Sequence, residues 1–186
     1  MNGEAQPSTD VGTHYLEESR RQLNAYKKLA EKAMAQVADA DLFRAPAAEA
    51  NSIAVIVQHI CGNQRSRFTD LLTTDGEKPD RNRDGEFEPR VATRAELMAL
   101  WEASWPVVFG SLASLQPGDL LRTVTIRGQP LTILQAILRQ VAHYAHHIGQ
   151  VVLLARQWKG EEWQSLSIPK GKSLSAEALA HEKKLH

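Results

Sequence analysis

Apolar residues recur at helical intervals along most of the chain, and this periodicity constrains the fold more than any other feature. Small or apolar side chains follow one another at steps of three and four from Leu16 to Val37 and again from Ile53 to Leu71. Similar segments extend from Leu97 to Leu112 and from Ile133 to Ala155. Because no strand-like segment has a comparable length, the pattern predicts an all-α protein built as a four-helix bundle.

Capping residues and a proline indicate where these helices begin and end. The first helix is expected to end around residues 39–43, because Pro46 follows shortly after. Capping residues precede the other three helices: Asn51 or Ser52 for the second, Thr93 with Glu96 for the third, and Thr132 with Gln135 for the fourth.

The connections between the helices differ in length. Residues 73–92 are rich in Gly, Pro and charged residues, which predicts a long loop between the second and third helices that crosses between non-adjacent helix ends. Residues 122–132 suit a short β-hairpin or an extended turn before the fourth helix, although Pro130 argues against a second strand. We expect a single domain over residues 1–186, with residues 1–11 and 176–186 flexible or peripheral. The tail from residue 159 begins as a loop and is expected to end in a short helix near residues 175–184.

Charge and cysteine content exclude several classes of function. The 22 Lys and Arg residues are balanced by 22 Asp and Glu residues, so no overall positive field favours nucleic acid or an anionic membrane. Cys61 is the only cysteine, which excludes an internal disulfide and every multi-cysteine zinc motif. The polar first ten residues do not resemble a signal peptide, and the longest aliphatic stretch, residues 151–155, is too short to span a membrane. A cytoplasmic protein is the simplest expectation, and a bound metal would need His or carboxylate ligands.

Three histidines are the strongest candidates for a chemical site. His143 and His147 lie one turn apart on the fourth helix, so both imidazoles can reach a common point. His59 occupies the interior of the second helix among polar residues where aliphatic ones would be expected. Three neutral imidazoles from two helices would leave coordination positions free for water and substrate, as a catalytic metal requires.

Other residues near this set have weaker signals. A His pair one turn apart also occurs on solvated helix faces, so the pair by itself does not distinguish a metal site from a polar surface. His146 is interpreted as a packing residue or as a residue that contacts a ligand. Gln140 and Gln150 lie on the same face and are candidates for orienting ligands or substrate, with Tyr144 ranked below them. No carboxylate stands out as a general acid or base.

Arginine and tryptophan residues form two further clusters in the sequence. Arg65, Arg67, Arg81 and Arg83 alternate with acidic residues, and this favours a solvated mixed-charge surface over an anion-binding clamp. Trp101 and Trp105 are one turn apart, as in a core or a dimer contact. Cys61 is interpreted as a small buried residue and not as a nucleophile.

Two motifs resemble a known superfamily. The run Asn51-Ser-Ile-Ala-Val-Ile-Val-Gln-His59-Ile-Cys-Gly-Asn63 and the later run Gln140-Val-Ala-His143-Tyr-Ala-His-His147-Ile-Gly-Gln150 resemble the DinB-like (YfiT-like) superfamily of metal-dependent enzymes. The tail segment over residues 165–173 further resembles one uncharacterised bacterial branch. The resemblance covers about residues 12–175.

The resemblance implies a fold, a metal and a type of reaction. It implies a four-helix bundle that binds a divalent metal, nickel or zinc, through His59, His143 and His147. Characterised relatives include thiol-dependent S-transferases and a thiol-dependent isomerase, and homodimers are common among them. We therefore expect a metal-dependent transferase or hydrolase that activates a low-molecular-weight thiol or water towards a small electrophilic substrate. The alternative is a non-catalytic metal-binding or stress-related bundle, and neither the substrate nor a thiol-binding motif is implied.

Overall fold

A computed structural model describes residues 10–173 and residue 175, and it is mostly helical, as the sequence predicts. The α-helices are α1 (Val11–Met34), α2 (Asp39–Phe43), α3 (Ile53–Phe68), α4 (Arg94–Ser114) and α5 (Ile133–Lys159). Two short strands, β1 (Thr123–Ile126) and β2 (Gln129–Thr132), and three 3₁₀ turns, η1 (Asp84–Phe87), η2 (Pro117–Asp119) and η3 (Gly160–Glu162), complete the described elements. Among the described residues, each helix is too short or too polar to pass through a lipid bilayer.

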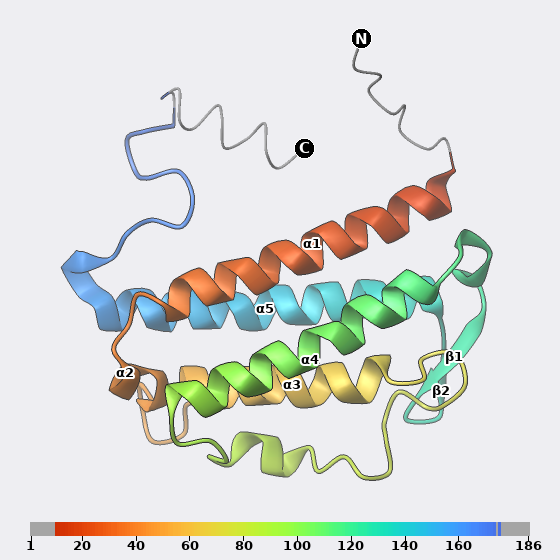
Figure 1. Cartoon of the computed structure of the whole chain (residues 1–186), viewed down its shortest axis with the longest axis horizontal. Coiled ribbons are helices and arrows are strands. Elements are labelled where there is room, and N and C mark those ends of the chain that lie inside the picture. The colour runs from red at the N-terminus through yellow and green to blue at the C-terminus, as the bar shows by residue number, and fades with distance from the viewer. Residues whose placement is uncertain (1–9, 174, 176–186) are drawn as a thin grey trace.

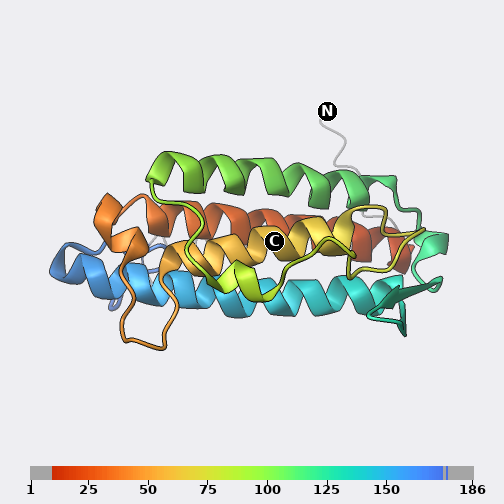
Figure 2. The same cartoon turned by 90° about the horizontal axis from the view of Figure 1, so that it is seen from below.

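The four long helices lie side by side and run in two directions. Helices α1 and α5 pack against each other and point the same way, while α3 and α4 pack together and point the opposite way (Figure 1). Since α3 and α4 are parallel, the chain between them must return along the molecule before α4 can begin. The long loop over residues 69–93 makes this return beside α3 (Figure 2), which agrees with the crossing connection that its length predicts.

The predicted caps are present at the helix starts. The Ser52 hydroxyl accepts a hydrogen bond from the Val55 amide at 3.3 Å, and complete capping boxes begin α4 and α5 at Thr93 and Thr132. The predicted end of the first helix is wrong, because α1 stops at Met34 and residues 39–43 form the separate helix α2.

Both predictions for the chain ends fall largely outside the described residues. Asp10 caps α1 by accepting a hydrogen bond from the Thr13 amide at 2.9 Å, and Val11 is the first helical residue. Within the segment expected to be flexible or peripheral over residues 1–11, Asp10 and Val11 are exposed, and residues 1–9 lie outside the described residues. The short helix predicted near residues 175–184 also falls there, apart from Ser175.

The hairpin before α5 forms despite its proline. Arg127 and Gly128 connect the strands with φ values of 57° and 69°, the left-handed conformation that a two-residue hairpin turn requires. Pro130 lies opposite Thr125, whose carbonyl accepts a hydrogen bond from the Gly76 amide at 2.8 Å outside the hairpin. The Thr125–Pro130 pair thus exchanges no ladder hydrogen bonds, and the missing proline N–H leaves the sheet intact.

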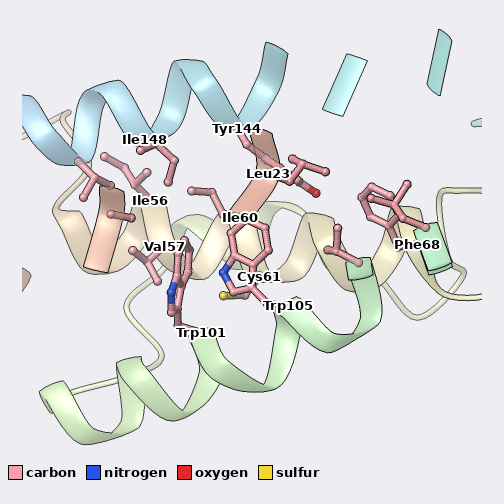
Figure 3. Packing of buried hydrophobic residues seen from close by; sticks show 14 of the residues in the cluster. Leu23, Ile56, Val57, Ile60, Cys61, Phe68, Trp101, Trp105, Tyr144 and Ile148 are labelled. Carbon is pink, nitrogen blue, oxygen red and sulfur yellow. The ribbon is translucent and has the colours of Figure 1, made fainter. Parts of the chain in front are cut away.

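Helix α3 is enclosed on nearly every side. Fourteen of its 16 residues are buried, because α4, α5, α2 and the long loop all pack against it. On its α4 side, Trp101 and Trp105 are fully buried with ring centroids 5.2 Å apart (Figure 3), which confirms their interpretation as core. Cys61 lies beside them and accepts a hydrogen bond from the Ser104 hydroxyl. Burial raises the pKa of the Cys61 thiol to about 12, so it is not a nucleophile.

Candidate metal centre

His59, His143 and His147 bring their Nε2 atoms together between α3 and α5. The Nε2 atom of His143 lies 3.3 Å from that of His59 and 3.1 Å from that of His147. One nitrogen from each of the three rings lies within 4.8 Å of the others. The three side chains are named below as the three-histidine centre.

Two of the three separations between these nitrogens match those of ligands around one small cation. Two imidazole nitrogens that each bind a metal at about 2.1 Å, at angles between the octahedral and tetrahedral values, are separated by about 3.0 to 3.4 Å. Both Nε2 distances measured from His143 fall in this range.

Glu86 determines which nitrogen of His59 faces the centre. Its carboxylate lies 2.9 Å from the Nδ1 atom of His59. Burial acts to raise the pKa of Glu86, but the hydrogen bond from His59 and the Arg81 guanidinium outweigh it and lower the pKa. Since an ionised carboxylate can only accept, Nδ1 of His59 carries a proton, and Nε2 presents a lone pair when the ring is neutral. The Phe87 ring stacks on the face of the His59 imidazole, with ring centroids 4.7 Å apart.

Gln150 determines in a similar way which nitrogen of His147 carries the proton. Its Nε2 atom lies 3.3 Å from the Nε2 atom of His146, so its amide donates there and its Oε1 atom faces His147. Oε1 lies 2.8 Å from Nδ1 of His147, which therefore carries the proton. His147 thus also presents a lone pair at Nε2, and His146 contacts the partner of a candidate ligand.

The chemistry of this donor set fits a divalent cation. Two lone pairs, from His59 and His147, converge on the Nε2 atom of His143, which can donate a hydrogen to only one of them. Burial lowers the pKa of His143 to about 3, with the neighbouring imidazoles adding to the effect, and burial also lowers the pKa of His147. Both rings are therefore neutral at physiological pH. Neutral imidazoles with convergent lone pairs are ligands suited to zinc or nickel.

The long loop positions Glu86 through several contacts. Arg81 donates two hydrogen bonds to the Glu86 carboxylate, at 2.7 and 2.9 Å. Gln58 donates to the backbone carbonyls of Glu86 and Glu88, at 2.9 and 2.7 Å. Gly62 faces the Glu86 side chain so closely that a Cβ atom there would overlap the carboxylate. Gln58 and His59 of α3 therefore hold the loop, and this explains why these two polar residues interrupt its apolar face.

The arginine cluster is only partly solvated. Arg65 is exposed and pairs at 3.5 Å with the equally exposed Asp80, as on a mixed-charge surface. Arg67 and Arg81 contradict that interpretation, because their side chains are only 8% and 4% exposed. Glu77 accepts hydrogen bonds from both, and this pairing makes their burial possible.

A pocket of about 260 Å³ opens beside the three-histidine centre. Five arginines line it, together with His59, Asn63, Gln140 and His143: Arg67, Arg81, Arg83, Arg127 and Arg139. His143 and His147 are only half-buried, whereas His59 is 3% exposed. The centre is thus closed on the α3 side and open towards solvent and the pocket.

The candidates for orienting ligands or substrate occupy different positions. Gln150 contacts His147, and Gln140 is buried in the pocket wall. Tyr144 is fully buried and donates to Oδ1 of Asn63 at 2.9 Å, and its hydroxyl contacts none of the three histidines. Sequence reasoning missed Glu86, because a glutamate in a charged loop has no local pattern that distinguishes it from a solvated one.

The fold and this site together define a helical protein with a candidate three-histidine metal centre. The chain belongs to the family described as Protein of unknown function (DUF1572), whose profile matches residues 10–172. That family is itself of the DinB/YfiT-like type, and its domain is uncharacterised. A search of curated proteins found no significant match.

Proposed function

We propose that the chain is a metal-dependent enzyme with a DinB/YfiT-like four-helix bundle, in which His59, His143 and His147 hold a zinc or nickel ion. The observation that carries this proposal is the convergence of three Nε2 atoms, two of them fixed as lone pairs by Glu86 and Gln150. Carboxylate and amide partners on the far nitrogen are typical of metal-binding histidines.

The open side of the centre supports catalysis over a purely structural metal. Structural zinc sites are usually closed by four protein ligands, whereas catalytic sites keep a position for water or substrate. No fourth His, Cys, Asp or Glu joins the three-histidine centre within the described part of the chain. The adjoining pocket leaves room for a small molecule at the open side.

The proposed reaction is transfer of a thiol to a small electrophile, or hydrolysis of that electrophile. A bound cation would lower the pKa of a thiol or water, so that the nucleophilic anion exists near neutral pH. The thiolate would attack the electrophilic carbon, the leaving group would depart with its bonding electrons, and the thiol proton would pass to solvent. The residues of this chain orient the imidazoles and exclude water on the α3 side.

Metal content is the first test. Protein purified without a nickel column should contain about one zinc or nickel ion per chain by elemental analysis. His59→Ala and His143→Ala should each lose it, whereas His14→Ala should keep it, because His14 is on α1 and outside the three-histidine centre. Full metal retention in His59→Ala would refute the assignment of ligands.

Turnover separates the enzyme from the non-catalytic alternative. The metal-loaded protein should accelerate the reaction of 1-chloro-2,4-dinitrobenzene, or of a panel of similar electrophiles, with cysteine, glutathione or other small thiols. The rate with His59→Ala serves as the background. If metal binds stoichiometrically but no thiol or water reacts faster than this background, the non-catalytic metal-binding protein is the better description.

A further inference from the structure

We propose that the arginine-lined pocket beside the three-histidine centre binds an oxyanion, a carboxylate or phosphate group carried by the small-molecule substrate. This inference rests on the proposed function for the idea of a substrate, but it depends on different residues. The substrate would therefore be an anionic small molecule.

The charges around the pocket do not cancel. Three of its arginines, Arg67, Arg81 and Arg127, share two carboxylates. Glu77 accepts from all three, and Glu86 accepts from Arg81 and from His59. Among the described residues, no acidic side chain lines the pocket itself.

Two more arginines add positive charge without any ion pair among the described residues. Arg139 comes from α5, one residue before Gln140 in the pocket wall. Arg83 comes from the long loop, where its guanidinium lies over the Phe87 ring at 5.5 Å. These two exposed guanidinium groups are free to pair with an anion at the pocket.

Neutral polar groups in the wall also lack partners. Gln140 is 3% exposed, and its Oε1 atom has no hydrogen-bond partner in the structure, but an acceptor oxygen cannot bind an ionised oxyanion. Asn63 is 5% exposed, and its Oδ1 atom accepts from Tyr144, so its amide N–H groups remain to donate. Buried polar groups without hydrogen-bond partners are unusual in protein cores, and a bound ligand can supply the missing partner.

The size and position of the pocket limit what can bind. A volume of about 260 Å³ is close to the lower end of small-molecule pockets, so it suits a small acid or the charged end of a larger substrate. Because His59 and His143 form part of the same wall, a bound oxyanion would place the rest of the molecule near the three-histidine centre. The concave shape also differs from the extended basic surface that nucleic acid needs.

Anion binding is tested by isothermal titration with succinate and with inorganic phosphate at low ionic strength, using metal-free and zinc-loaded full-length protein. Saturable binding of either ion is expected, with weaker binding as salt is raised, and the stronger of the two identifies the preferred group. The uncharged analogue succinamide should not bind. Arg139→Gln and Arg83→Gln should each raise the Kd at least five-fold.

Arg156→Gln is the matched control. Arg156 lies on the same helix as Arg139, is also exposed, and is about 25 Å away along the helix axis at 1.5 Å per residue. Its Kd should stay within two-fold of the wild-type value. Absence of saturable binding by both ions up to about 10 mM, or equal Kd values for all three variants, would overturn the inference.

The two proposals fail in different ways. Zinc content of Arg139→Gln should remain at the wild-type level, because Arg139 is not a candidate ligand. Metal binding without anion binding would refute the anionic substrate alone. Anion binding by a protein that never holds a metal would refute the proposed function alone.

Discussion

Replacing Glu86 by Gln tests how the long loop controls the three-histidine centre. The carboxylate has two roles: it accepts the Nδ1 proton of His59 at 2.9 Å, and it pairs with Arg81 through two hydrogen bonds. A glutamine keeps the shape and one acceptor oxygen but removes the charge. Its amide N–H group would then face either an imidazole N–H or a guanidinium.

The first expected effect is on metal affinity. Loss of a partner on the far nitrogen of a metal-binding histidine commonly weakens affinity by 10- to 100-fold. This corresponds to about 1.4 to 2.7 kcal/mol at 25 °C. Competition with a chromophoric zinc chelator at pH 7.5 measures the Kd directly, and far-UV circular dichroism shows whether the variant is folded.

The second expected effect is on stability. The Arg81 side chain is 4% exposed, and without Glu86 its remaining carboxylate is Glu77 at 3.4 Å. Breaking a buried ion pair costs about 3 to 5 kcal/mol, and the retained acceptor oxygen places Glu86→Gln near the lower value. Urea unfolding of the metal-free protein measures this loss.

Glu77→Gln is the control that separates the two effects. Glu77 pairs with Arg67, Arg81 and Arg127 but contacts none of the three histidines. It should therefore lower the free energy of unfolding while leaving the zinc Kd within about two-fold, a difference of roughly 0.4 kcal/mol. Equal zinc affinity in Glu86→Gln and the wild type, or an equal loss of affinity in Glu77→Gln, would refute the role assigned to Glu86.

Three further substitutions test other parts of the structure. Gly62→Ala should displace the Glu86 carboxylate and weaken zinc binding in the chelator assay, and unchanged affinity would show that the close approach is unimportant. Tyr144→Phe should cost about 1 to 2 kcal/mol in urea unfolding, because Asn63 loses its buried partner, and the zinc Kd should not change. Asp75→Ala should cost about 2 kcal/mol at pH 7, because the carboxylate accepts from backbone amides of the long loop and the hairpin turn. These hydrogen bonds lower the pKa of Asp75, so its stabilisation is present above the unfolded value near 4 and is lost as the pH falls through the folded value. The unfolding free energies of wild type and Asp75→Ala should thus converge below about pH 4, and a constant difference down to pH 2 would contradict this account.

The sequence by itself determined the local features of this protein. Helical periodicity and capping residues depend on positions close together in the chain, so the long helices and the starts at Ser52, Thr93 and Thr132 were predictable. For residues 122–132 the sequence left a hairpin and an extended turn as alternatives, and the structure has the hairpin. The pairing of His143 with His147 is local in the same way, since one helical turn places both on one face. The break between α1 and α2 was missed, because the periodicity is uninterrupted there and the turn at residues 35–38 has no strong breaker.

Only the tertiary structure decided what surrounds these histidines. Glu86 reaches His59 across 27 positions of the chain because the parallel packing of α3 and α4 forces the loop back along α3. The same return buries Arg67 and Arg81, which look like surface residues in a charged segment, and it adds Arg83 to a pocket that α5 completes with Arg139. Charge pairing and burial depend on which segments meet in space, and the spacing of residues along one segment holds no information about a partner from another.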